Sequence, residues 1–137
     1  MVSASRTKAS VLVVEDDAIA REVLAQLLQA SGYDVIASPT GEQALLILCH
    51  HGQEIDWFVS KVELPGLVCG RILADEYHEH HPGRPAVLLS SLDPADKPSA
   101  NAVFIPPLAL MRILEVLQAL KSPEPAQVLP FPTPKAA

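Results

Sequence analysis

The sequence is poor in cysteine, in aromatic residues and in long apolar runs. Its two cysteines, Cys49 and Cys69, lack CxxC spacing and are too few for a disulfide framework. The longest wholly apolar stretch without proline is 44–49, far shorter than a membrane-spanning helix. We therefore expect free thiols in a reducing cytoplasm and no transmembrane segment.

An excess of basic charge is also lacking. The chain carries 10 Lys and Arg against 16 Asp and Glu, a net charge of −6, so it has no field that attracts nucleic acid or an anionic membrane. Apolar residues make up 49% of it, enough for one buried core. Prolines number 13 and crowd the end of the chain. We expect a disordered lead-in over 1–9, one domain over 10–121 with no room for a second, and a proline-rich flexible tail over 122–137.

Short apolar runs alternate with helical patterns along the domain. Strands are predicted by the runs at 11–14, 34–37, 57–60, 86–90 and 102–105. Helices are predicted after residue 17, over 44–49, from 67 to about 80 and over 108–121; a capping box at 40–43 favours the second. This alternation is typical of an α/β fold, a parallel sheet with helices on both faces.

Polar residues follow several of these predicted strands. In a doubly wound sheet, binding and chemistry are placed at the carboxyl ends of the strands. There the first strand delivers Glu15 and Asp16, the third Lys61, the fourth Ser90 and the fifth Ile105. We expect these residues to lie along one edge of the molecule.

The order and spacing of these motifs resemble the receiver domain of bacterial two-component response regulators. The resemblance rests on VLVVEDD at 11–17, TGEQAL at 40–45, DWFVSKVELPG at 56–66, PAVLLSS at 85–91 and Ile105-Pro106. It implies a CheY-like, flavodoxin-like doubly wound sheet of five parallel strands in the order 2-1-3-4-5. It also makes the Ile105–Pro106 bond a candidate for the cis form.

In that family, an aspartate ending the third strand accepts a phosphoryl group from a histidine kinase. An acidic pair after the first strand holds Mg²⁺, and a hydroxyl ending the fourth strand contacts the phosphoryl oxygens. By position, Glu15 and Asp16 match the acidic pair and Ser90 matches the hydroxyl.

Three other parts of the family's switch are replaced. The phosphoacceptor position, four residues before Pro65, holds Lys61; the lysine position on the fifth strand holds Ile105; and the aromatic position on that strand holds Ala102. An ammonium group cannot form the acyl phosphate, which needs a carboxylate nucleophile. We predict that Lys61 instead pairs with Glu15 and Asp16, so the site takes no metal and no cofactor.

The chain is also short where the family has its fourth helix. Prolines 94 and 98 fall in the segment 92–101, so that helix is expected to be shortened or absent. The last helix would then lose a neighbour and leave apolar residues uncovered. Its candidate interaction surface comprises Leu110, Met111, Leu114 and Leu117.

The sequence thus predicts a stand-alone atypical response regulator that is not an enzyme. It would act by phosphorylation-independent contact with a histidine kinase or another receiver, or as a homodimer, without nucleic acid or membrane. The alternative is a small flavodoxin-like enzyme or nucleotide-binding module that uses Lys61 in the crevice at the strand ends. A lysine between two carboxylates should have a raised pKa, and no glycine-rich loop follows the first strand, which disfavours both forms of the alternative.

Overall fold

The structure is a computed structural model that describes residues 8–90, 102–106 and 109–121. Within these residues, five parallel strands form one sheet in the order β2-β1-β3-β4-β5. The strands are β1 (Ser10–Val14), β2 (Asp34–Ser38), β3 (Trp57–Lys61), β4 (Ala86–Leu89) and β5 (Ala102–Ile105). The predicted doubly wound fold and strand order are confirmed.

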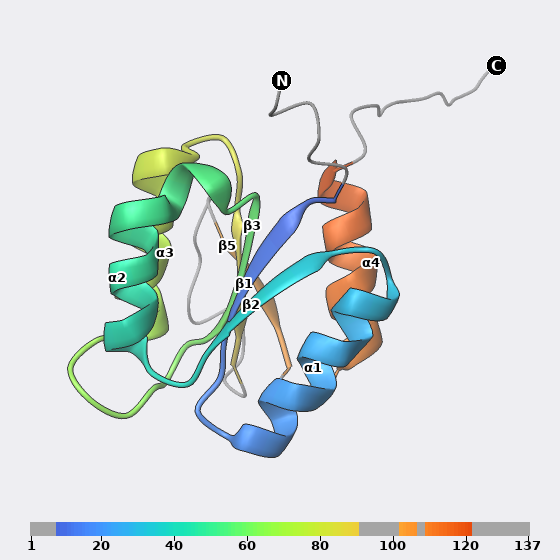
Figure 1. Cartoon of the computed structure of the whole chain (residues 1–137), viewed down its shortest axis with the longest axis horizontal. Coiled ribbons are helices and arrows are strands. Elements are labelled where there is room, and N and C mark those ends of the chain that lie inside the picture. The colour runs from blue at the N-terminus through green and yellow to red at the C-terminus, as the bar shows by residue number, and fades with distance from the viewer. Residues whose placement is uncertain (1–7, 91–101, 107–108, 122–137) are drawn as a thin grey trace, which may run out of the picture.

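Helices cover both faces of this sheet (Figure 1). Helices α1 (Ala18–Ala30) and α4 (Leu110–Lys121) lie on one face, and α2 (Gly41–His51) and α3 (Gly70–His80) lie on the other. A short 3-10 helix, η2 (Gly52–Glu54), follows α2. The label α4 denotes the helix after β5. The segment 92–101, where we predicted a shortened or absent helix, lies outside the described residues, as do most of the lead-in and the tail 122–137.

The core consists of two apolar clusters, one on each face of the sheet. Alternate residues of β1 supply both, because successive side chains of a strand point to opposite faces. Val11 and Val13 pack with residues of α1 and α4, whereas Leu12 and Val14 pack with residues of α2 and α3. Burial on both faces explains why this strand is a continuous apolar run.

Helix α4 turns its apolar stripe toward the sheet. Leu117 is fully buried and Leu114 is 8% exposed, and both belong to the same cluster as Ile105. Leu110 packs partly against that cluster, and of the four residues of the predicted surface only Met111, at 62%, is well exposed. The predicted uncovered surface on this helix is therefore wrong for Leu114 and Leu117, because the helix is amphipathic and uses them for the core.

The loop after β3 is longer than predicted, since α3 begins at Gly70 rather than at Leu67. The Gly70 N–H donates a hydrogen bond to the Val62 carbonyl at 2.8 Å. A Cβ at position 70 would lie 2.3 Å from the carbonyl oxygen of Lys61, so only glycine fits this close approach. No peptide bond among the described residues is cis, so the expectation of a cis Ile105–Pro106 bond is wrong.

Side chains cap both helices that follow β1 and β2. The Asp17 carboxylate accepts a hydrogen bond from the Ala20 N–H at 2.8 Å, and the Thr40 hydroxyl accepts one from the Gln43 N–H at 3.1 Å. Each cap satisfies a backbone donor that the first helical turn leaves unpaired.

In the part of the chain that the structure describes, no helix has both the length and the apolar character needed to cross a membrane.

Candidate functional site: an ion-pair cluster at the carboxyl end of the sheet

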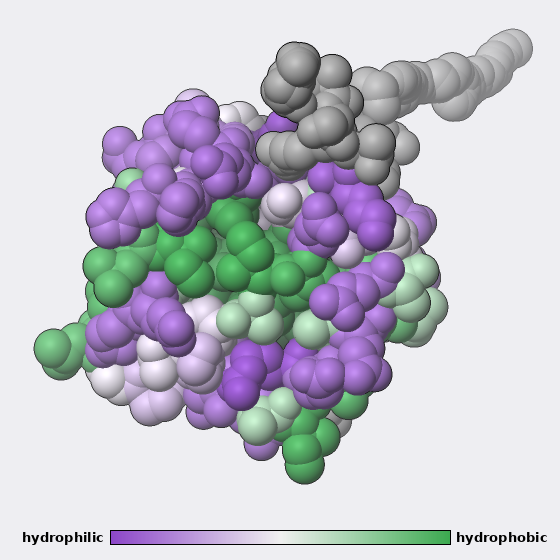
Figure 2. Space-filling view, in the orientation of Figure 1, coloured by the Kyte–Doolittle hydropathy of each residue, from purple (hydrophilic) through white to green (hydrophobic). Residues whose placement is uncertain are grey.

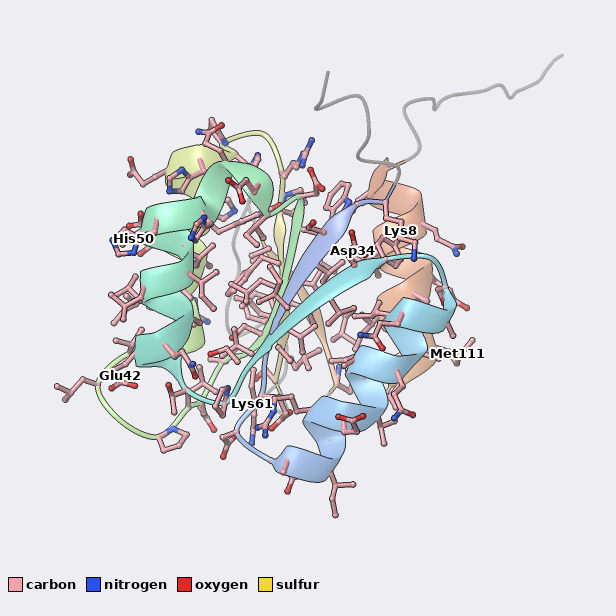
Figure 3. All side chains as sticks on the ribbon, in the orientation of Figure 1. Lys8, Asp34, Glu42, His50, Lys61 and Met111 are labelled. Carbon is pink, nitrogen blue, oxygen red and sulfur yellow. The ribbon has the colours of Figure 1, made fainter. Side chains whose placement is uncertain are left out.

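The site lies where β1 and β3 end side by side. Val14 pairs with Ser60 in the parallel register, so the residues that follow them meet at the same edge. Figure 3 shows Lys61 at this edge, near the loop that leads into α1. The Lys61 Nζ lies 2.9 Å from Oδ1 of Asp16 and 3.6 Å from Oε2 of Glu15. The predicted ion pair is therefore present.

Glu15 is the buried member of the cluster, with 7% of its side chain exposed. Its Oε2 accepts a hydrogen bond from the Asp17 N–H at 3.0 Å, and its own N–H donates to the Ser38 carbonyl at 3.2 Å. Arg21 donates from Nη1 to the Glu15 carbonyl at 2.8 Å. These bonds fix the turn that presents Glu15 and Asp16 to Lys61.

Mutual attraction sets the charge states of the partners. A hydrogen bond from Lys61 lowers the pKa of Asp16. A hydrogen bond to Asp16, with the added attraction of Glu15, raises the pKa of Lys61 against the opposing effect of burial. Asp16 is thus a carboxylate and Lys61 an ammonium at neutral pH. Because about a third of each side chain is exposed, this pair contributes about 1 kcal/mol or less to stability.

The loop after β3 is tied to the start of α2. Gly66 follows Pro65 with a φ of 95°, and the Glu42 carboxylate accepts a hydrogen bond from the Leu67 N–H at 2.8 Å. This bond lowers the pKa of Glu42. The Leu67 side chain is 90% exposed, so the backbone hydrogen bond to Glu42 holds an apolar side chain in solvent near the end of the sheet.

The other predicted site residues lie just after β4 and on β5. Ser90 follows β4, and its N–H donates to the Ile105 carbonyl at 3.0 Å, so both reach the same edge as Lys61. Ile105 is fully buried in the core on the α1 and α4 side. Ala102 begins β5 opposite Ala86 and packs on the other face, so it lies away from this edge.

The cluster has the residues for an ion pair rather than for a metal centre. Glu15 and Asp16 would be suitable oxygen ligands, but the Lys61 ammonium lies against both carboxylates. Among the described residues, no group of three His, Cys, Asp or Glu side chains is arranged to hold a metal ion.

Two contacts of the site were not predicted from the sequence. Arg21 reaches back six residues to the Glu15 carbonyl, and Glu42 bridges to a loop 25 residues further on. Neither carries a motif of its own. Glu42 lies within the predicted capping box at 40–43, and this motif was the only feature of the sequence that could have indicated a role for it.

Comparison with known proteins agrees with the fold. The model of the response regulator receiver domain matches residues 11–103, more than half of the chain, and the chain belongs to this family. The transcriptional regulatory protein AruR of Pseudomonas aeruginosa is 41% identical over 59 residues, which cover 41% of this chain and 24% of that protein. The chain thus matches about a quarter of that relative's length.

Solved structures share the fold over nearly their whole length. The receiver domain of the hybrid histidine kinase CckA is 29% identical, with a TM-score of 0.67, over 80% of this chain and 96% of that one. A receiver protein from Sinorhizobium medicae has a TM-score of 0.76 at 22% identity, over 88% of this chain and 100% of that one. The second likeness shows the fold alone.

Proposed function

We propose that this receiver signals through protein contact without aspartyl phosphorylation. The observation that carries the proposal is Lys61, whose ammonium pairs with both carboxylates at the end of the middle strand. Lys61 precedes Pro65 by four residues, the spacing of the family's phosphoaccepting aspartate. In this proposal Lys61 occupies the degenerate phosphoacceptor position.

The chemistry of the cluster supports this assignment. An ammonium offers no carboxylate oxygen for an acyl phosphate, and its raised pKa keeps it charged. Mg²⁺ would have to displace this cation from Glu15 and Asp16 against charge repulsion. Glu15 and Asp16 are, in this view, the residual acidic pocket of a lost metal site.

The remaining switch positions fit the same assignment. Ser90 retains the hydroxyl, but Ile105 offers no cation to a phosphoryl group and is enclosed in the core. Ala102 has no aromatic ring to swing toward Ser90. Lys61, Ile105 and Ala102 thus stand where the family's switch has its phosphoacceptor, its lysine and its aromatic residue. Replacement of all three supports a receiver that phosphorylation does not control.

Exposed apolar residues near the site supply a contact surface. Helix α1 begins just after Asp16, and its outer face carries Ile19, 76% exposed, and Val23, 45% exposed. Leu67 adds the exposed apolar side chain of the β3–α3 loop. We propose that a histidine kinase or another receiver docks here. A cytoplasmic location fits such a partner and the two free thiols.

Intact-mass measurement after incubation with acetyl phosphate and Mg²⁺ tests the proposal. The expected result is an unchanged mass for the native chain. A stoichiometric phosphoryl adduct would overturn the proposal. A receiver of the family that retains its aspartate serves as the positive control, because it must gain the adduct under the same conditions.

The enzyme alternative is not favoured. A Schiff-base amine has to be neutral, and the carboxylates that raise the pKa of Lys61 oppose this. Borohydride trapping of a carbonyl compound on Lys61 would restore that alternative.

A further inference from the structure

Strand β2 is an open edge of the sheet. It pairs with β1 on one side and stands first in the strand order of the described residues. In Figure 1 it crosses the front of the molecule between α1 and α2. Edge strands usually carry lysine, proline or a bulge that prevents pairing with another chain. The strand Asp34–Ser38 has neither lysine nor proline, and its one charged residue, Asp34, stands at its first position.

The backbone groups on this edge can be assigned from the pairing with β1. The Asp34 N–H donates to the Ala9 carbonyl at 2.9 Å, and the Ser38 carbonyl accepts from the Glu15 N–H at 3.2 Å. Because alternate residues bond to the neighbour in a parallel pair, Val35 and Ala37 direct their N–H and C=O groups outward. Two donors and two acceptors thus face away from β1.

Apolar side chains flank these groups. Ile36 is 39% exposed and lines a groove of about 340 Å³ together with Ile47 and Ile55, while Ser10, His51 and Glu54 complete the lining. Figure 2 shows a hydrophobic band that crosses this front of the molecule from α2 to the β2 edge. A contiguous apolar surface beside an open strand is typical of an association site.

We propose that a second copy of the chain pairs with this edge, β2 antiparallel to β2, on a two-fold axis at Ile36. Val35 then lies opposite Ala37 of the second copy, and each such pair exchanges two backbone hydrogen bonds. The two Ile36 side chains meet at the axis as a non-hydrogen-bonded pair, the pair type with the closest side-chain approach.

The charge pattern and the register favour a second copy in this alignment. Asp34 lies opposite Ser38, so the two carboxylates stand at opposite ends of the ribbon and no like charges oppose each other. An axis at Ala37 would place Pro39, which has no N–H, opposite Val35. The axis at Ile36 uses all four outward groups, and a two-fold contact is the commonest symmetry of homo-oligomers.

This pairing does not depend on the absence of phosphorylation, so its failure would leave the proposed function standing. Sedimentation and light scattering of the full chain test it against the 14.7 kDa monomer. Ala37→Pro removes an outward donor while sparing the bonds to β1, and Ile36→Lys places two ammonium groups at the axis. The control is Met111→Lys, on the exposed side of α4.

The native chain and the control are expected to be dimers. Both β2 variants are expected to dissociate, with a dimer Kd about tenfold or more higher. Far-UV circular dichroism checks their folding. Hydrogen exchange needs no variant: the amides of Val35 and Ala37 should become protected as the chain concentration rises. A monomeric native chain, or a dimer that withstands Ile36→Lys and leaves both amides unprotected, would overturn the proposal.

Discussion

Lys61 and Asp16 join the end of the middle strand to the turn after β1 through a 2.9 Å contact between Nζ and Oδ1. The contact links residues 45 positions apart and places a cation against the acidic pair of a receiver domain. The following substitutions test what this ion pair contributes to the stability of the fold and to the charge at this edge of the sheet.

The Lys61–Asp16 pair should stabilise the fold only between two pH limits. The lowered pKa of Asp16 gives stability that is fully present above its ordinary value of 3.8 and is lost as pH falls through the folded value. The raised pKa of Lys61 gives stability that is fully present below its ordinary value of 10.5 and is lost as pH rises through the folded value.

Asp16→Asn should therefore lower the unfolding free energy by about 0.5–1 kcal/mol at pH 7. The difference from the native chain should stay constant between the two ordinary pKa values, 3.8 and 10.5, and shrink below the first and above the second. Urea titrations followed by the fluorescence of the buried Trp57 measure it. A difference that grows on acidification would contradict the assigned direction.

Gly66→Ala should destabilise the β3–α3 loop more than the same change at two other glycines. Position 66 has a φ of 95°, and a Cβ there would lie 2.5 Å from Oε2 of Glu42, so alanine strains the backbone and displaces the carboxylate from its hydrogen bond with the Leu67 N–H. We expect a loss of about 1–3 kcal/mol. Gly32→Ala should cause only the backbone strain of its φ of 98°, because no atom of the described residues lies close to the added Cβ. Gly83→Ala should cause neither backbone strain nor a close contact. Thermal unfolding of the three variants should rank them in that order, and equal losses would show that Glu42 does not restrain the loop.

Substitutions in α4 should separate its buried face from its exposed face. Leu117 is fully buried, so Leu117→Ala should cost about 2–5 kcal/mol, while Met111→Ala, at an exposed position, should stay within about 0.5 kcal/mol. Denaturant unfolding of both variants provides the measurement. Comparable small losses would restore the predicted open surface on this helix.

The strand order and the Lys61 ion pair could be predicted because both depend on the alternation of strands with helices and on the register of the parallel strands. Once β1 and β3 are parallel neighbours, Glu15 and Lys61 must meet at their carboxyl ends. The role of Leu114 could not be predicted in this way. The helix is amphipathic, so its sequence places Leu114 on the apolar side. Whether that side is covered depends on how the helix packs on the sheet, which the sequence does not specify.

Contacts that depend on loop geometry were also beyond the sequence. The bond between Glu42 and the Leu67 N–H requires the backbone path of the β3–α3 loop. That path in turn requires the positive φ of Gly66 and the close approach at Gly70. Local patterns identify glycine as a turn residue, but they do not identify which distant side chain the turn will meet.

Lys61→Asp should convert the ion-pair cluster into a magnesium-responsive site. Three carboxylates at one edge repel one another, so without Mg²⁺ the variant should unfold at a lower temperature than the native chain. Oxygen ligands are those that Mg²⁺ prefers, and a cation that binds only the folded state stabilises it by mass action. The variant should therefore gain several degrees in Tm on addition of millimolar Mg²⁺, whereas the native chain should not change. Lys61→Met, which removes the ammonium without adding a carboxylate, is the matched control and should gain less than Lys61→Asp at equal ionic strength. An equal Mg²⁺ shift in the native chain would mean that Lys61 does not exclude the metal, and the proposed loss of the phosphorylation site would lose its physical basis.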